Sequence, residues 1–270
     1  MIMRNFQRGF KHLLDKLNKH EPFAFTRFSD GELYILQNRT VIIENNSCVV
    51  REQSHAVCWG DEELKAFIPE KDIALNQHLT KAFLHKQPNY FKGLCTKGDV
   101  GGVDWDWQFA DGRLDRDDDH LTFANLLING NYKKFMDVMI PEIRMAKHKV
   151  IYVCNKLADL TNFPLDLVKD FRIGQNCHIN DVHLIDEMKE WIQTNDISDH
   201  LFLFSAASLT NLLIYELYKD FPNNTYMDVG STLNPMLGLY GWKASRGYLR
   251  GYWLGETQDH YYNQIGIWED

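Results

Sequence analysis

The sequence predicts an α/β protein of the Rossmann-like class, with a mostly parallel sheet covered by helices on both faces. Two observations lead to this class. Short apolar segments alternate with amphipathic segments of helical length along most of the chain. No repeat, low-complexity tract or Pro/Gly/Ser-rich linker divides the 270 residues. We therefore expect a single domain over residues 1–270, which ends in an aromatic-rich C-terminal extension at 236–270.

The first part of the chain supplies the opening elements. Apolar residues recur at helical spacing from Phe6 to Leu17, which predicts an amphipathic helix. Two asparagines, Asn45 and Asn46, suit the turn of a small hairpin. The further elements expected here are strands at 23–28, 41–43, 48–50 and 90–94, and helices at 31–36 and 76–86.

The second part of the chain alternates more regularly. Strands are expected at 150–154, 170–173, 201–204 and 225–229, and helices at 121–129, 132–146, from Leu157, at 182–192 and at 206–219. Strands that alternate with helices of this length favour a parallel sheet. Because ligands of such sheets bind beyond the carboxyl ends of the strands, that edge is where we expect the chemistry.

Composition excludes several classes of protein. The net charge of -8 gives no general attraction to nucleic acid or anionic membranes. Mean hydropathy is -0.38, and no apolar run approaches the roughly 18 residues of a membrane span. The N-terminal residues lack the apolar core of a signal peptide. The five cysteines are scattered without a C-x-x-C pair, which argues against disulfides or zinc and favours a cytoplasmic location.

The most informative segment follows the first predicted strand. Asp30 and Glu32 are hard oxygen ligands, separated by Gly31, at the edge where ligands bind. Such a pair suits Mg²⁺ or Mn²⁺ that also binds phosphate oxygens, and a glycine lets a diphosphate approach the backbone. Arg27 could add a bidentate phosphate contact. The competing interpretation is a helix capping box, with Ser29 as N-cap and Glu32 three residues later.

A resemblance to a known family favours the first interpretation. Residues 27–33, RFSDGEL, resemble the Asp-x-Glu element of GT-D-type glycosyltransferases, a family long catalogued as a domain of unknown function. Residues 89–95, NYFKGLC, fall where that family has a short strand after a helix. Residues 204–213, FSAASLTNLL, and 226–230, YMDVG, are similar to its C-terminal strand, helix and strand. The similar region spans about residues 20–235, in order.

The resemblance implies a Rossmann-like fold, a nucleotide-sugar donor and a divalent metal near the acids, a role that falls here on Asp30 and Glu32. It also implies a glycosyltransferase activity, for which we take a UDP-sugar as the first candidate donor. The sequence departs from the family in two places. The usual Gly-Pro-Thr is replaced by residues 205–207, SAA, and a His that often follows Asp-Ile-Gly is Ser231.

Further candidates for the site follow two later strands. Ser205 and Ser208 lie where the 201–204 strand gives way to a helix, whose free N–H groups would attract an anion. Ser205 could equally be only a helix cap. Asp228 ends the last strand, where it could hold a sugar hydroxyl, act as the base for the acceptor, or only cap the residues that follow. The chain contains neither G-x-G-x-x-G nor a P-loop.

Two aromatic-rich segments remain. Residues 101–107, GGVDWDW, contain an Asp-x-Asp pair, which we treat as an alternative metal pair or as a loop that stacks on a sugar. Asp104 or Asp106 would then be the general base, unless the loop is purely structural. Residues 240–253 interleave aromatic and basic side chains, and either bind a ligand or pack back as a structural arm. The acidic run before Leu121 is expected to be a solvated helix N-terminus.

These observations predict a metal-dependent glycosyltransferase that moves a sugar from a nucleotide-sugar to an acceptor hydroxyl. The expected acceptor is a glycan, with a hydroxymethylated base in phage DNA as a second possibility that the net charge disfavours. The alternatives are a metal-dependent nucleotide-sugar hydrolase and a non-catalytic nucleotide- or glycan-binding module.

Overall fold

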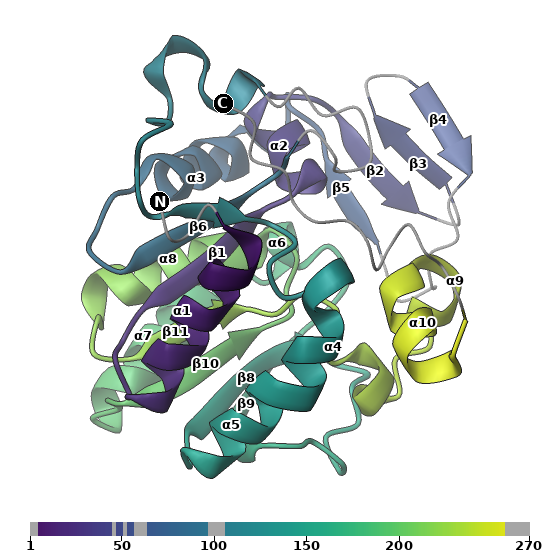
Figure 1. The fold of residues 1–270 in the computed structure, drawn as a ribbon. Coiled ribbons are helices and arrows are strands. Elements are labelled where there is room, and N and C mark those ends of the chain that lie inside the picture. Colours follow the sequence, from purple (N-terminus) through teal and green to yellow (C-terminus); the bar gives the residue numbers. More distant parts are fainter. Residues whose placement is uncertain (1–4, 45–46, 51–52, 57–63, 97–105, 257–270) are drawn as a thin grey trace.

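The computed structural model describes residues 5–44, 47–50, 53–56, 64–96 and 106–256. Its centre is a seven-stranded sheet with the order β7-β6-β1-β11-β10-β8-β9, in which every neighbouring pair is parallel (Figure 1). The strands are β1 (Ala24–Phe28), β6 (Tyr90–Leu94), β7 (Leu121–Phe123), β8 (Lys149–Asn155), β9 (Asp166–Ile173), β10 (His200–Phe204) and β11 (Thr225–Asp228). The predicted Rossmann-like class is confirmed.

The central strands are buried on both faces, as expected for a parallel sheet covered by helices. In β1, Ala24 and Phe28 belong to one hydrophobic core, whereas Phe25 points into the other. Side chains of a strand alternate between the two faces of a sheet, so a single strand feeds both cores. The sheet therefore separates two apolar layers.

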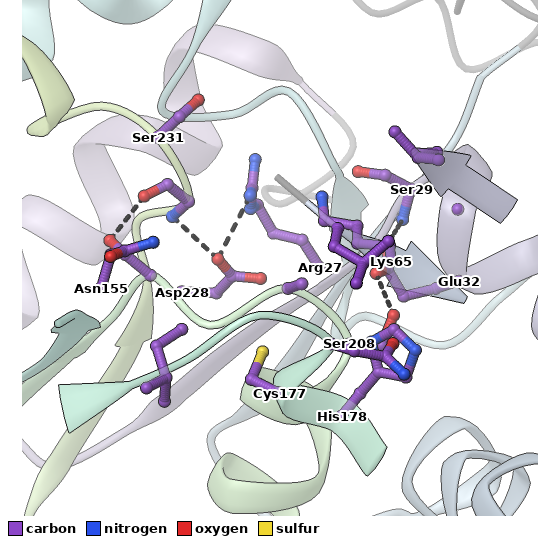
Figure 2. A pocket seen from close by; sticks show the side chains of 18 of the residues that line it. Arg27, Ser29, Glu32, Lys65, Asn155, Cys177, His178, Ser208, Asp228 and Ser231 are labelled. Atoms are coloured by element: carbon purple, nitrogen blue, oxygen red, sulfur yellow. Dashed lines mark hydrogen bonds and ion pairs between the residues drawn. The ribbon is translucent and has the colours of Figure 1, made fainter. Parts of the chain in front are cut away.

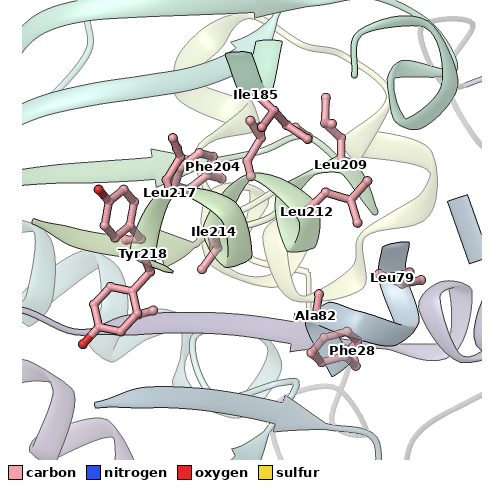
Figure 3. Close-up of a cluster of buried hydrophobic side chains, with 14 of the residues drawn as sticks. Phe28, Leu79, Ala82, Ile185, Phe204, Leu209, Leu212, Ile214, Leu217 and Tyr218 are labelled. Carbon is pink, nitrogen blue, oxygen red and sulfur yellow. The ribbon is translucent and has the colours of Figure 1, made fainter. Parts of the chain in front are cut away.

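One face of the sheet is covered by helices α2, α3, α6, α7 and α8. Figure 3 shows Leu209 and Leu212 of α8 in this core, with Leu79 of the neighbouring α3. The sequence produces this packing because α8 is apolar on most of its surface and is buried along its length. The helices are α2 (Asp30–Leu36), α3 (Ile73–Leu84), α6 (Cys177–Asn180), α7 (Leu184–Thr194) and α8 (Leu209–Asp220).

The other face is covered by the predicted opening helix, α1 (Phe6–Asn18), by the helical run 132–145 and by the C-terminal helices. The run comprises α4 (Tyr132–Lys134), a π-helical segment (Phe135–Met139) and α5 (Ile140–Met145). Asn5 caps α1 by accepting a hydrogen bond from the Arg8 N–H at 2.9 Å. Among the described residues, no helix is both long and apolar enough to cross a membrane.

A second sheet lies beside the first. It has four antiparallel strands in the order β4-β3-β2-β5, and it contains the predicted hairpin as β2 (Val41–Glu44) and β3 (Ser47–Val50). The sequence analysis did not predict β4 (Gln53–Ala56) or β5 (Lys65–Phe67). In Figure 1 this small sheet lies on the same side of the molecule as the C-terminal helices α9 (Trp242–Ser245) and α10 (Gly247–Leu254).

Two predicted helices are wrong. Residues 121–123 form the edge strand β7 beside β6, followed by turns, and the acidic run before it therefore precedes a strand. All three residues of β7 are buried, and a short buried apolar run has the same appearance in a helix and in a strand. No helix starts at Leu157, because the Asn155 side chain accepts a hydrogen bond from the Leu157 N–H and makes a turn.

Candidate active site at the carboxyl edge of the sheet

A pocket of about 380 Å³ opens at the carboxyl edge of the parallel sheet, within the size range of small-molecule sites. Strands β1, β8, β9, β10 and β11 end at this pocket, as the rule for parallel sheets predicts (Figure 2). Two walls come from outside that sheet: strands β2 and β5 of the small sheet, and the C-terminal segment 239–248. Its charged lining residues are Arg27, Asp30, Glu32, Lys65, Asp228 and Arg246.

Glu32 forms the capping box that the sequence offered as the alternative to a metal site. One carboxylate oxygen accepts a hydrogen bond from the Ser29 N–H at 3.1 Å, and the other accepts one from the Ser208 hydroxyl at 2.7 Å. Ser208 lies at the start of α8, so Glu32 links the loops that follow β1 and β10. The capping interpretation is confirmed, and the two oxygens of Glu32 are engaged by protein donors.

Asp30 differs from Glu32. Its side chain is open to the pocket, and it accepts a hydrogen bond from the Gly31 N–H at 2.9 Å. Desolvation by the surrounding protein raises the pKa of this carboxylate, and the nearby Glu32 raises it further. Arg246 and Lys65 act in the opposite direction. A carboxylate that is destabilised by its surroundings gains from any cation that enters the pocket.

Arg27 and Asp228 form a buried ion pair, with Nη2 and Oδ1 3.2 Å apart. Burial disfavours the guanidinium charge, but Asp228, Tyr248 and Glu32 together outweigh it and raise the pKa of Arg27. Asp228 also accepts a hydrogen bond from the Gly230 N–H at 2.9 Å. The sequence analysis predicted that Asp228 would lie at this edge, and the structure places its carboxylate directly against Arg27.

Gly230 is required by this arrangement. Its φ is +50°, and a Cβ at this position would lie 2.2 Å from Nη2 of Arg27. Both the backbone conformation and the close approach of the guanidinium therefore exclude a side chain. At Gly31, by contrast, a Cβ would meet nothing within 4 Å. A side chain would therefore fit at position 31, and the room for a ligand there does not depend on Gly31 being a glycine.

Ser205 and Ser208 both hydrogen-bond to protein groups in this structure. Helix α8 begins at Leu209, four residues later than Ser205, so Ser205 is not its cap. The Ser205 hydroxyl donates to the Gly230 carbonyl at 2.5 Å and accepts from the Tyr152 hydroxyl at 2.8 Å. The Ser208 hydroxyl donates to Glu32. A hydroxyl has a single proton to donate, and here both serines donate it to groups on other loops. Their contact with a donor phosphate stays a prediction.

The described side chains of the pocket suit a metal ion only if substrate phosphates complete its coordination. No cluster of three or more His, Cys, Asp or Glu side chains in the described part of the chain could hold an ion by itself. Mg²⁺ and Mn²⁺ are nevertheless commonly bound by one or two carboxylates together with substrate phosphates. Asp30 suits such an ion, with Glu32 next to it but already hydrogen-bonded.

The alternative acids of the sequence analysis were Asp104 and Asp106. Asp104 lies outside the described residues. Asp106 does not line the pocket; its side chain is 74% exposed and pairs with Arg116 at 3.0 Å. The neighbouring Trp107 is half-buried beneath the Arg113 guanidinium, 4.4 Å from the ring centroid. Asp106 and Trp107 thus contact other protein groups, and the roles expected of Asp104 and Asp106 stay predictions.

Lys65 and Arg246 are the charged pocket residues that the sequence analysis did not single out. Arg246 lies in the basic, aromatic segment 240–253, whose composition was the signal that could have identified it. That segment both packs as an arm and lines the pocket, because Trp242 and Tyr248 are buried in the core while Arg246 and Tyr248 face the cavity. Lys65 belongs to an unpredicted strand and carried no motif.

Comparisons with known proteins agree with this fold. Neither family models nor curated proteins match the chain. A solved structure described as "A New Glycosyltransferase (DUF1792) from Streptococcus sanguinis" is similar over 97% of this chain and 93% of that one, with a TM-score of 0.52 and 13% identity. A second, of which it is said that the highly conserved domain of unknown function 1792 has a distinct glycosyltransferase fold, is similar over 100% of this chain and 91% of its own, with a TM-score of 0.51 and 14% identity.

A selenomethionine-substituted structure of the same domain gives the same values, with a TM-score of 0.51 and 14% identity. At these identities the comparison concerns the fold. The expectation drawn from residues 27–33 and 226–230 is confirmed at that level, since both segments end strands at the edge of the shared sheet. This chain has the fold of the domain of unknown function 1792, which is described as a glycosyltransferase fold.

Proposed function

We propose that this protein is a glycosyltransferase that takes its sugar from a nucleotide-sugar, with a UDP-sugar as the first candidate, and that the pocket at the sheet edge is its active site. The observation that carries the proposal is the convergence of an open carboxylate, Asp30, and a fixed guanidinium, Arg27, in one pocket. A similar fold in a protein described as a new glycosyltransferase supports it.

In the proposed reaction an acceptor hydroxyl attacks the anomeric carbon of the donor. The bond from that carbon to the diphosphate oxygen breaks, the nucleoside diphosphate leaves, and the hydroxyl proton passes to a base or to water. A Mg²⁺ or Mn²⁺ ion held by Asp30, with Glu32 beside it, would offset the charge that develops on the leaving diphosphate. Arg27 would contact a phosphate oxygen from the opposite side.

Asp228 would act through Arg27. Its carboxylate is 3.2 Å from the guanidinium and is only about 5% exposed, so it has little freedom to take a proton from an acceptor. We therefore assign it a positioning role: it fixes the orientation of Arg27. The earlier alternatives for the base, Asp104 and Asp106, stay predictions from the sequence. The acceptor proposed is a glycan hydroxyl, and the site is proposed to work in the cytoplasm.

The test is an assay of nucleoside diphosphate release with a panel of nucleotide-sugars, with Mn²⁺ or Mg²⁺, and with glycan acceptors whose mass is followed. We expect release with one donor, accompanied by a gain of one sugar on an acceptor, and its loss in Asp30→Asn. Asp111→Asn is the control, because Asp111 is 82% exposed and pairs with Arg113 outside the pocket.

Two results would change the proposal. Release of free sugar at the same rate with and without acceptors would indicate a nucleotide-sugar hydrolase. Binding of a nucleotide with no turnover of any donor, in the wild-type chain, would indicate a binding module.

A further inference from the structure

The ring of His178 has one nitrogen that the protein leaves without a partner. Its Nε2 lies 2.9 Å from the carbonyl oxygen of Ala66, whereas Nδ1 has no hydrogen-bond partner among the residues that the structure describes. His178 is only 2% exposed, and it lines the pocket from α6 (Figure 2). Buried polar atoms of folded proteins nearly always have a partner, so this nitrogen calls for an explanation.

The bond to Ala66 determines which nitrogen of the ring carries the hydrogen. A carbonyl oxygen can only accept, so Nε2 donates. Burial lowers the pKa of His178 and outweighs the bond to Ala66, which raises it. The ring is therefore neutral at neutral pH, and Nδ1 carries no hydrogen. Nδ1 is an acceptor, and its partner has to be a group that donates a hydrogen, which an ionised phosphate does not.

Hydrogen bonds hold α6 and the residue before it against β5. The Asn176 N–H donates to the Leu64 carbonyl at 2.8 Å, and the Ala66 N–H donates to the Asn176 side chain at 2.9 Å. The bond from Nε2 of His178 to the Ala66 carbonyl is the third. Together these bonds fix both the position of the His178 ring and the nitrogen that is left as an acceptor.

The surroundings of His178 are largely apolar. Strand β5 pairs with β2, where Phe67 lies opposite Val41, and Cys177 precedes His178 in α6. These three neighbours are buried and line the same pocket. Apolar side chains with few polar groups suit a flat heterocycle of which one edge is recognised. A sugar ring would leave several of its hydroxyls without partners there.

We propose that Nδ1 of His178 accepts a hydrogen bond from the N3–H group of a uracil base and thereby selects a uridine nucleotide as the donor. The inference rests on the proposed function, and it assigns the part of the pocket between β5 and α6 to the base of the nucleotide-sugar. Uracil offers the ring N–H that such an acceptor requires, whereas adenine and cytosine have no ring N–H in a nucleotide. His178 is thus a specificity-determining residue, and it takes no part in the bond changes of the transfer.

The test is titration calorimetry of the full chain with UDP, N3-methyl-UDP and 5-methyl-UDP, in the presence of Mn²⁺. N3-methyl-UDP has a methyl group in place of the N3 hydrogen, and 5-methyl-UDP keeps that hydrogen with the same added bulk. We expect N3-methyl-UDP to bind wild type about tenfold more weakly than UDP, as for the loss of one buried hydrogen bond. The affinity of 5-methyl-UDP should lie within about threefold of that of UDP.

Two variants separate the role of Nδ1 from that of Nε2. In His178→Gln the side-chain amide can still donate to Ala66, but the acceptor at the position of Nδ1 is lost. In His178→Asn an amide oxygen can take the position of Nδ1, but the bond to Ala66 is lost. We expect His178→Gln to bind UDP about tenfold more weakly and to distinguish it no longer from N3-methyl-UDP. His178→Asn should keep the distinction, which a merely structural histidine would not explain.

His183→Gln is the matched control, because His183 is exposed and is not among the residues that line the pocket. Thermal midpoints of all variants show whether they are folded. The comparison of UDP with N3-methyl-UDP on wild type needs no variant, so it decides the question even where a variant does not fold.

Three results would overturn this role of His178 and leave the proposed function standing. The first is equal binding of UDP and N3-methyl-UDP by wild type, and the second is an undiminished preference for UDP in His178→Gln. The third is tighter binding of ADP, GDP or CDP than of UDP. If the wild-type chain binds no nucleoside diphosphate at all, with or without Mn²⁺, the role of His178 and the proposed function both fail.

Discussion

The edge of the parallel sheet and the two walls that close over it are built differently. At the edge, the polar side chains bond to groups on neighbouring loops: Glu32 accepts from the Ser208 hydroxyl, Ser205 donates to the Gly230 carbonyl, and Asp228 pairs with Arg27. The walls are joined to the rest of the protein by hydrogen bonds and by packing of buried aromatic rings, and the cations Lys65 and Arg246 line the cavity. The edge is thus cross-linked by its own polar groups, whereas each wall is joined to the sheet by a few contacts and contributes a basic residue to the lining of the cavity.

Asp30 is the exception at the edge, because it is the carboxylate there that the protein engages least. Its neighbour Glu32 has the opposite character, with protein donors on both oxygens. The comparison therefore separates two acids that look equivalent in the sequence: Asp30 is suited to a cation and a substrate, and Glu32 to the loops. The following variants test this difference, in order of the effect expected.

The largest effect is expected for Asp30→Asn. Removal of the metal-binding charge should reduce transfer by roughly a hundredfold or more. The folded state should not suffer, because the raised pKa of Asp30 means that its charge is unfavourable at neutral pH. We expect the thermal midpoint to stay the same or rise. A large fall in the midpoint would contradict the assignment of Asp30 to substrate rather than to structure.

Gly230→Ala should affect both stability and binding. A Cβ would collide with Arg27 and would also occupy a positive φ, at an expected cost of about 1–3 kcal/mol of unfolding free energy and with displacement of the guanidinium. Gly238→Ala is the control, since Gly238 has φ +68° but nothing within 4 Å of a new Cβ. Denaturant unfolding and nucleotide titration of both variants measure the difference. Equal nucleotide binding in the two variants would exclude Arg27 from the site.

Glu32→Ala should lower the unfolding free energy by about 1–2 kcal/mol, because the Ser29 N–H and the Ser208 hydroxyl lose their acceptor. Activity should fall less than in Asp30→Asn, since the loops become looser but the metal-binding charge remains. Denaturant unfolding and the release assay give the two values. If Glu32→Ala loses as much activity as Asp30→Asn and keeps its stability, Glu32 is mainly a metal ligand.

The smallest effect is a shift in pH dependence. Because the folded-state pKa of Asp30 is raised, metal-assisted nucleotide binding should weaken on acidification already above pH about 4, the region of an ordinary aspartate. Over the same window the contribution of Asp30 to the stability of the protein should rise as pH falls, because the folded state binds this proton more tightly than the unfolded state does. Titration of wild type and Asp30→Asn across pH checks this. The same pH dependence of nucleotide binding in wild type and Asp30→Asn would contradict this prediction.

Much of the edge was predictable from the sequence. Residues 201–204 are a continuous apolar run, and residues 24–28 and 225–228 also carry large apolar side chains, as expected of strands buried on both faces. The edge rule then brings Arg27, Asp30 and Asp228 together. The strand at 121–123 was mistaken for a helix. A short, fully buried apolar run shows no alternation of apolar and polar residues that would distinguish a strand from a helix.

The walls were less predictable. Lys65 reaches the pocket through hydrogen bonds between β5 and residues 176–178, more than a hundred positions away, and no local pattern encodes such a contact. Ser205 and Ser208 were placed correctly at the turn, but the acceptors of their protons lie after β11 and in helix α2. The sequence could therefore indicate where the site is, but not which of its polar groups are already satisfied.

The central claim is that Asp30 holds a metal together with the diphosphate of a donor. The most direct measurement is the thermal midpoint of wild type, Asp30→Asn and Asp111→Asn with a panel of nucleoside diphosphates, with and without Mn²⁺, because ligands of the native state raise the midpoint. We predict an additional, metal-dependent rise with one nucleotide in wild type and Asp111→Asn, and its loss in Asp30→Asn. The same metal-dependent rise in Asp30→Asn, or no metal-dependent rise in any variant, would contradict the claim.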